Sequence, residues 1–220
     1  MAKDLSQYLG SVWLAMEDLY AGQTKEVPFH GWHHVRFVAV NASRFAAELG
    51  ADAVQAEIAG LVHDVNYLVT KRSDAADGRA LRQRVLTAVG MAEDSIAAIE
   101  DVVVTAETHS RSRDISPEAM ALSDADTLFK ALPITPVILA PLYMRETGMS
   151  LRELAEKIVG EQVPLRDSGI YFYSDSAKRK YAQWADANLT LWSCILDSLD
   201  DASVLQVVDD VAKYTKISSQ

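Results

Sequence analysis

A helix-length apolar run from Ala56 to Tyr67 constrains this chain more than any other feature of its sequence. The run reads AEIAGLVHDVNY and carries His63 and Asp64 side by side near its end. Its apolar neighbours predict burial, where an ionised carboxylate persists only if it is paired, hydrogen-bonded or bound to a metal ion. One cation would satisfy both residues, although a hydrogen-bonded histidine in a core is the commoner explanation of a single such pair.

Apolar residues at helical spacing recur along the chain without an alternating strand pattern, so the sequence predicts an all-α fold. A length of 220 residues suits one domain with a substantial core, over residues 1–220. Loops are expected from Asn66 to Gly78 and through Pro164 to Gly169. The expected helices run from Leu5 to Tyr20, about His30 to Leu49 with Gly50 as the cap, Asp52 to the His63-Asp64 pair, Asp94 or Ser95 towards His109, Ser116-Pro117 through Asp126, around Val137 to Arg145, Ser150 to about Val159, about Ser176 to Leu199, and about Ala202 to Tyr214 as a packing or oligomer-contact segment.

One of these predicted helices carries two aspartates, Asp124 and Asp126. Its apolar stripe passes through Leu122 and Ala125 at the helical period. Asp126 falls beside that stripe, whereas Asp124 is expected to face away from the core. If Asp126 is the one of the two that acts in a site, replacement of Asp124 by alanine is expected to be nearly silent.

Histidine also opens the predicted helix upstream, where residues 30–35 read HGWHHV. The ordered set of His34, the His63-Asp64 pair and Asp126 resembles the HD superfamily of metal-dependent phosphohydrolases. The resemblance covers roughly residues 29–129. It implies a helical bundle of the HD-domain type, with an HD core at about 29–130 and a C-terminal helical extension at about 131–220.

The resemblance assigns four metal ligands, namely His34, His63, Asp64 and Asp126. It also places Asp64 to orient the attacking water or to bridge to a second ion. Two imidazoles and two carboxylates suit Mn, Fe, Co, Ni or Zn better than Mg, which prefers oxygen ligands. A bound ion would lower the pKa of water towards about 7 and polarise a phosphoryl oxygen. The expected reaction is hydrolysis of a phosphate ester of a small molecule, with a nucleotide as one candidate.

Two further histidines, His30 and His109, are expected to act in catalysis. His30 matches the position where the phosphodiesterase branch of the superfamily carries its leaving-group proton donor in a Tyr-His-Asn segment. This chain reads Phe29-His30-Gly31 instead, so a hydrogen-bonded histidine at the helix entry is the alternative. His109 lies alone between the HD pair and Asp126, where dinuclear relatives need two histidines; the shortage favours one ion per chain. It is expected to touch the substrate phosphate or to cap its helix.

A basic cluster follows the HD pair and includes Lys71, Arg72 and Arg79, with Arg82 and Arg84 beyond. The first three are expected to bind the phosphate of the substrate. The alternative is a solvated face balanced by nearby aspartates.

The formal net charge of −10 argues against binding of a nucleic-acid polymer, whose phosphates need many lysines and arginines. A local basic pocket still suffices for a small phosphorylated substrate. The single cysteine, Cys194, excludes an internal disulfide and suits a reducing compartment. No signal peptide is predicted, because Asp4, Glu17 and Asp18 interrupt the first apolar positions. No membrane helix is predicted either, because the longest uncharged run, at 131–144, is shorter than about 20 residues and contains three prolines. The expected location is the cytoplasm, with no membrane partner.

Two other functions compete with the phosphohydrolase. An oxygenase of the same fold would activate dioxygen at two irons, the second held by His109 and unrecognised carboxylates. A metal-binding or metal-free interaction module would keep the fold without turnover.

Overall fold

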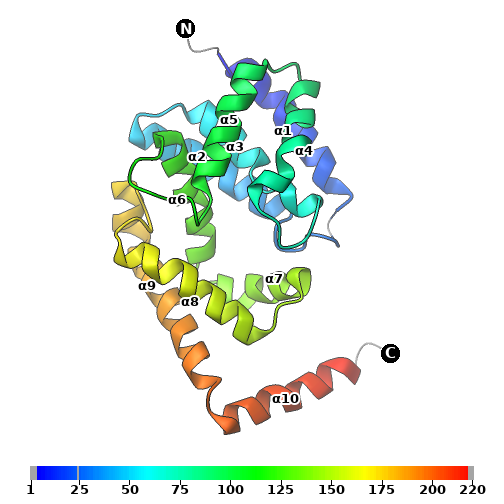
Figure 1. Cartoon of the computed structure of the whole chain (residues 1–220), viewed down its shortest axis with the longest axis vertical. Coiled ribbons are helices and arrows are strands. Elements are labelled where there is room, and N and C mark those ends of the chain that lie inside the picture. Colours follow the sequence, from blue (N-terminus) through cyan, green and yellow to red (C-terminus); the bar gives the residue numbers. More distant parts are fainter. Residues whose placement is uncertain (1–3, 24, 218–220) are drawn as a thin grey trace.

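The chain folds into a stack of helices, as the computed structural model in Figure 1 shows. The structure describes residues 4–23 and 25–217, and within these ranges it contains no strand. The predicted all-α class is therefore confirmed. The α-helices are α1 (Ser6–Ala21), α2 (Trp32–Leu49), α3 (Ala53–Val62), α4 (Arg79–Ala88), α5 (Glu93–Ala106), α6 (Pro117–Ala131), α7 (Ala140–Thr147), α8 (Leu151–Asp167), α9 (Asp175–Ser198) and α10 (Ala202–Ile217), with short turns η1 (Val65–Leu68), η2 (Ala75–Gly78) and η3 (Thr135–Leu139).

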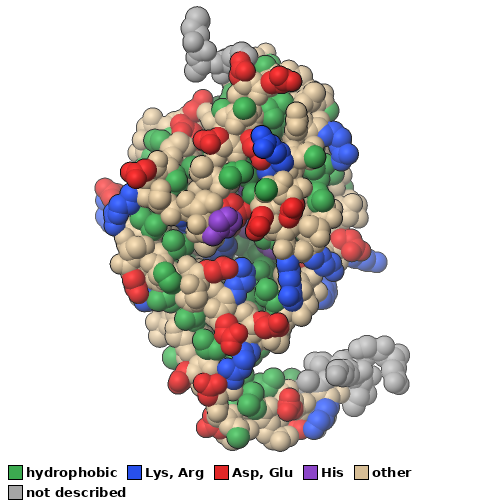
Figure 2. Space-filling model, viewed as in Figure 1, with side chains coloured by type: hydrophobic (Ala, Val, Ile, Leu, Met, Phe, Trp, Pro, Cys, Tyr) green, Lys and Arg blue, Asp and Glu red, His purple; other side chains and the backbone are tan. Residues whose placement is uncertain are grey.

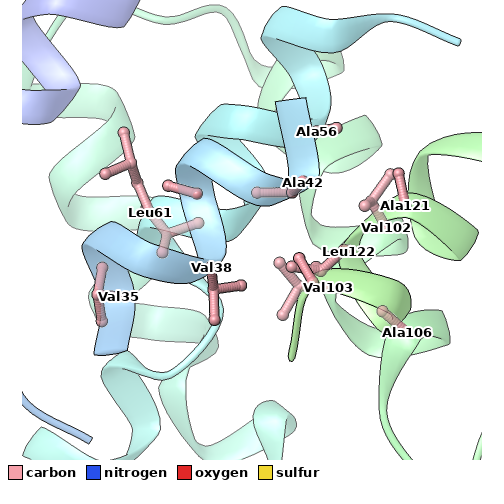
Figure 3. Close-up of a cluster of buried hydrophobic side chains, with 14 of the residues drawn as sticks. Val35, Val38, Ala42, Ala56, Leu61, Val102, Val103, Ala106, Ala121 and Leu122 are labelled. Atoms are coloured by element: carbon pink, nitrogen blue, oxygen red, sulfur yellow. The ribbon is translucent and has the colours of Figure 1, made fainter. Parts of the chain in front are cut away.

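Helix α2 lies at the centre of the fold and packs against both α3 and α6. Apolar side chains of these helices and of α5 interdigitate in the main core, where Val38 and Leu61 are fully buried (Figure 3). Burial of such side chains contributes about 1.5–3 kcal/mol each. The helix ends follow local rules of capping: Gly50 closes α2 at a left-handed φ of 71°, and the Asp52 side chain accepts hydrogen bonds from two backbone amides at the start of α3.

Gly60 allows α2 and α3 to approach more closely than a side chain would permit. A Cβ atom at this position would lie 2.7 Å from the Cα atom of Ala39 on α2. Gly60 lies in the last turn of α3, three residues before His63. The close crossing therefore sets the separation of the histidines that α2 and α3 carry.

Several predicted helix boundaries are wrong. Helix α4 was not expected, because its three arginines were interpreted only as a charge cluster. Helix α5 begins at Glu93 rather than at Asp94 or Ser95, and it ends before His109. Helix α8 continues through Pro164 to Asp167, where a loop was expected. A proline removes only one backbone donor and here falls in the last turn, so the helix tolerates it.

The expectation that Asp124 faces away from the core is also wrong. Its side chain is fully buried and accepts hydrogen bonds from the backbone amides of Tyr173, at 2.6 Å, and Ser174, at 2.8 Å. Asp124 thus anchors the segment that enters α9 to α6. The spacing correctly predicted that Asp124 and Asp126 point to different sides of α6. It did not reveal that the segment before α9 covers the side that carries Asp124.

The C-terminal helices lie at one end of the stack. Helices α7 and α8 lie below the N-terminal helices in Figure 1, α9 runs alongside α6 and α8, and α10 extends away from the rest. Within α9, Trp192 is buried, whereas Trp184 and Leu191 are exposed.

Among the described residues, no single helix combines the length and apolar character needed to cross a membrane. One sharply bent pair, Pro117–Ala131 with Thr135–Thr147, meets those criteria only when both helices are taken together.

Candidate metal centre

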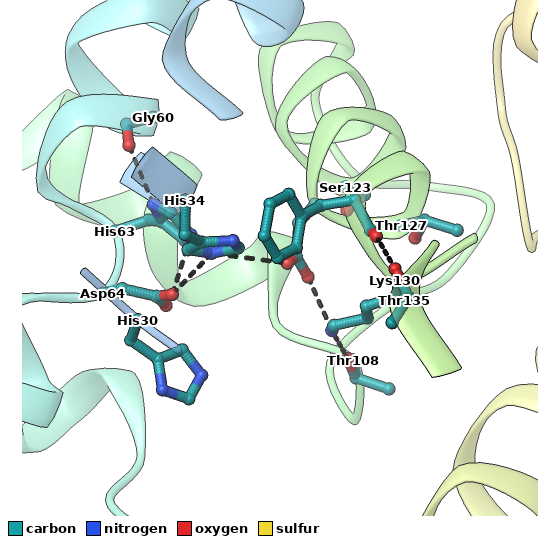
Figure 4. Close-up of polar contacts among 12 residues, drawn as sticks. His30, His34, Gly60, His63, Asp64, Thr108, Ser123, Thr127, Lys130 and Thr135 are labelled. Carbon is teal, nitrogen blue, oxygen red and sulfur yellow. Dashed lines mark hydrogen bonds and ion pairs between the residues drawn. The ribbon is translucent and has the colours of Figure 1, made fainter. Parts of the chain in front are cut away.

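Three of the predicted ligands, His34, His63 and Asp64, converge on one point (Figure 4). The Oδ2 atom of Asp64 lies 2.8 Å from Nε2 of His34 and 3.1 Å from Nε2 of His63. The two Nε2 atoms lie 3.1 Å apart. Two imidazole nitrogens and a carboxylate oxygen directed at one point are a donor set that suits a divalent transition metal.

The elements that carry these residues fix their orientation. His34 lies in the first turn of α2, and His63 and Asp64 follow the last residue of α3. Nδ1 of His63 lies 2.8 Å from the carbonyl oxygen of Gly60, so that nitrogen donates and Nε2 keeps its lone pair. Nδ1 of His34 is buried without a hydrogen-bond partner. The tautomer at His63 is the one that a metal ligand requires.

Asp126, the fourth predicted ligand, lies at the edge of this cluster on α6. Its Oδ1 atom is 3.9 Å from Nε2 of His34, while Oδ2 accepts a hydrogen bond from Lys130 at 2.7 Å. Arg111 approaches Oδ2 to 3.5 Å and donates to Thr127 at 2.5 Å. One carboxylate oxygen thus faces the histidines and the other is held by two cations. Metal ligation by Asp126 stays a prediction.

Burial and charge determine the protonation of these groups. Burial lowers the pKa of His34 to about 4, so this imidazole is neutral at neutral pH. Burial also disfavours the charged form of His63, but the charge of Asp64 outweighs it and raises the pKa of His63. Burial opposes ionisation of Asp64, and the two histidines nonetheless hold its pKa well below the usual range. At Asp126, Lys130 and His34 overcome burial and lower the pKa to about 2.

Both carboxylates are therefore ionised at neutral pH, and the imidazole of His34 is free to bind through its lone pair. A divalent ion fits this charge distribution and would compete with protons for Nε2 of His63, because metal binding releases protons from its ligands.

The centre opens into a cavity of about 460 Å³, within the size range of small-molecule sites. His63, Asp64, Asp126 and Lys130 line one end of it. Figure 2 shows a hollow near the middle of this face, surrounded by acidic and basic side chains and a histidine. The cavity is larger than a phosphate group requires.

His30 also lines the cavity, just before α2 begins. Its Nδ1 atom makes a short hydrogen bond with Glu146 of α7, whose other carboxylate oxygen accepts from the backbone amides of Phe29 and His30. The imidazole stacks on the ring of Tyr67, with centroids 3.5 Å apart. Both expectations for His30 are thus compatible with the structure: it is hydrogen-bonded, and its Nε2 remains available to the cavity.

The remaining predicted site residues fall at different places. His109 lines the cavity from the exposed turn after α5, three residues beyond the helix that it was expected to end. Arg72 lines the cavity and donates to the carbonyl of Thr147 at 2.9 Å. Lys71 and Arg79 are exposed and are not among the described residues that line the cavity. No observation tests the substrate roles of these four residues.

Arg82, a member of the predicted basic cluster, is fully buried and makes two hydrogen bonds of 2.7 Å with the Glu100 carboxylate. It also donates to the carbonyl of Ala75 at 2.5 Å. Arg82 therefore supports the loop after the HD pair from beneath and does not face the cavity.

Two residues that contact the predicted site residues, Lys130 and Glu146, were not predicted from the sequence. Lys130 lies one helical turn after Asp126, a spacing that could have identified it as an ion-pair partner. Glu146 lies 116 residues from His30, and no local pattern signals such a contact.

A model of the protein family described as the HD domain matches residues 31–130. The match contains His34, His63, Asp64 and Asp126 in the order on which the resemblance was based, and it ends at Lys130. No significant match was found to a curated protein or to a solved structure.

Proposed function

We propose that this protein is a metal-dependent phosphohydrolase that cleaves a phosphate ester of a small molecule, since residues 31–130 match the model of the HD domain. The observation that carries the proposal is the convergence of His34 Nε2, His63 Nε2 and Asp64 Oδ2 on one point beside a cavity. With Asp126 they would hold one divalent ion, for which Mn, Fe, Co, Ni or Zn is favoured over Mg. When bound, such an ion polarises a phosphoryl oxygen and makes water acidic enough to serve as the nucleophile.

The cations that line the cavity would hold the phosphate group. Lys130 and Arg72 both line it, and Lys130 already lies within 2.7 Å of Asp126. Their charges would attract the phosphate oxygens and stabilise the charge that develops on them during reaction. Exposed His109 also lines the cavity and would bind the phosphate from its rim.

His30 would donate the proton to the leaving oxygen. The carboxylate of Glu146 fixes the imidazole through Nδ1, so that Nε2 would be the atom that carries the proton towards the cavity. Burial opposes ionisation of Glu146, yet its hydrogen bonds with His30 and two backbone amides lower its pKa. Asp64 would orient the water opposite the leaving group.

The test is release of inorganic phosphate from a broad panel of phosphate esters, measured before and after metal removal and reconstitution. Turnover that depends on metal and is lost in a folded Asp64→Ala variant supports the proposal. If a protein with a filled metal site hydrolyses none of the esters, the result would contradict the phosphohydrolase and favour an oxygenase or a non-catalytic module. Consumption of dioxygen by protein with two irons would identify the oxygenase.

A further inference from the structure

Helix α10 carries an exposed apolar surface that we call the valine stripe. Its members recur at the spacing i, i+3, i+4 and i+7, so they share one face of the helix; they are Val204, Val207, Val208 and Val211. The exposed fractions of Val207, Val208 and Val211 are 61%, 37% and 55%. Figure 2 shows hydrophobic side chains on the surface of this helix, at the lower end of the molecule. A contiguous exposed stripe of this kind marks an interaction surface.

The rest of the chain does not cover this stripe. Among the described helices, none packs along α10, which extends away from the others (Figure 1). The helix has 16 residues, and helices of about this length are only marginally stable in water without packing. Valine lowers that stability further, because its branched side chain loses freedom in a helix. Helix α10 therefore needs a partner that covers the valine stripe.

The valine stripe is complementary to a second copy of itself. Its spacing reads the same from either end, with the midpoint between Val207 and Val208. If two copies of α10 pair antiparallel about a two-fold axis at this midpoint, Val204 of one copy lies opposite Val211 of the other. Val207 and Val208 each meet the same residue of the second copy beside the axis. Every valine of the stripe thus packs against a valine.

The charges of α10 favour this antiparallel direction. Asp200 and Asp201 precede the helix, whereas Lys213 and Lys216 stand near its end. An antiparallel pair brings the acidic start of each helix beside the basic end of the other and opposes the two helix dipoles. A parallel pair would place like charges together at both ends. The acidic residues also argue against a membrane surface, because helices that bind anionic lipids carry mostly lysine and arginine on their polar face.

We propose that the valine stripe is a dimer interface, in which two copies of this chain pair through antiparallel α10 helices. The sequence predicts either packing or oligomer contact for this segment, and the proposal specifies the second. It does not depend on the proposed phosphohydrolase function, since none of the described residues of α10 lines the cavity. A single pair of helices is a small interface, so the dimer is expected to dissociate at micromolar concentrations.

The first test is sedimentation equilibrium of the full chain from about 1 to 300 µM, a range that covers weak dimers. The mass of wild type is expected to rise with concentration from 24.1 kDa to twice that value. Val207→Lys should weaken dimerisation at least about 30-fold, because it places two like charges beside the axis. Gln206→Lys is the matched control, since it introduces the same side chain on the opposite face of α10 and should leave dimerisation unchanged.

A wild type that stays monomeric over the whole range, or equal weakening by the two variants, would overturn the proposal. A monomeric wild type that binds vesicles of anionic lipid would overturn it and would assign the valine stripe to a membrane.

The second test determines the direction of the helices by disulfide formation in a Cys194→Ser background, which removes the exposed native thiol. In the antiparallel pair the two copies of Val204 lie about 10 Å apart along the helix axis, beyond the Cα separation of about 7 Å that a disulfide spans. Val204→Cys alone should therefore not cross-link, whereas a mixture of Val204→Cys and Val211→Cys should. Efficient cross-linking of Val204→Cys with itself would show a parallel pair and overturn the proposal, as would the absence of any cross-link in the mixture.

Discussion

Replacement of Asp124 by alanine is expected to destabilise the protein without affecting its metal content. The carboxylate accepts two backbone hydrogen bonds, at 2.6 Å and 2.8 Å, at the entry to α9. Hydrogen bonds to a charged group contribute about 1.5–3 kcal/mol each. Burial raises the pKa of Asp124, which shows that the cost of burying its charge offsets part of this gain. We therefore expect a loss of about 2–4 kcal/mol in the free energy of unfolding.

That loss corresponds to a decrease in Tm of about 5–15 °C for a chain of this size. The assay is thermal and urea unfolding of metal-free wild type and Asp124→Ala, with metal binding measured separately on both. Asp126→Ala is the matched substitution, because Asp126 lies two residues away and points to the other side of α6, by about 200° of helix rotation. A change below about 0.5 kcal/mol in Asp124→Ala, the size of an ordinary surface effect, would refute the reasoning.

Three further predictions follow from the same contacts. Arg82→Ala should lower the free energy of unfolding by about 3–5 kcal/mol, because it removes a fully buried guanidinium and leaves the partly buried Glu100 carboxylate without its partner. Exposed Arg84→Ala should change it by less than about 0.5 kcal/mol in denaturant titrations, and equal losses in the two variants would contradict the stabilising role of Arg82. The lowered pKa of Glu146 means that its ionised form stabilises the folded state above the ordinary pKa of 4.5 and that this stability is lost as the pH falls through the lower folded value. The difference in unfolding free energy between wild type and Glu146→Gln should therefore be full at about pH 7 and shrink towards about pH 3, and a difference independent of pH would contradict this assignment. A divalent metal ion added at about 100 times its Kd should raise the free energy of unfolding of wild type by about 2.7 kcal/mol and leave that of Asp64→Ala unchanged. Thermal melts with and without chelator measure this difference. An equal response in both proteins would show that the ion binds elsewhere.

The parts of the site that depend on local sequence were predictable. His63 and Asp64 end a short apolar helix, and His34 opens another, so helical geometry and order along the chain were enough to relate them. The helix starts expected at Asp52 and Ser116 are confirmed, because both residues cap their helices and a cap depends on the few residues beside it.

Contacts between distant segments were not predictable in the same way. Asp124 looked exposed because nothing near it in sequence reveals Tyr173 and Ser174, which cover it. Arg82 looked like a surface cation because its partner Glu100 lies on the next helix. The side chains that complete the cavity from α7, α8 and α9 come from outside the HD match, and their position depends on the packing of the whole chain.

Elemental analysis of the purified protein tests the central claim most directly, with metal equivalents per chain measured for wild type, Asp64→Ala and Asp124→Ala. We expect about one equivalent of a divalent transition metal in wild type and in folded Asp124→Ala, and none in folded Asp64→Ala. Absence of metal from wild type even after reconstitution, or its full retention in Asp64→Ala, would contradict the proposed metal centre.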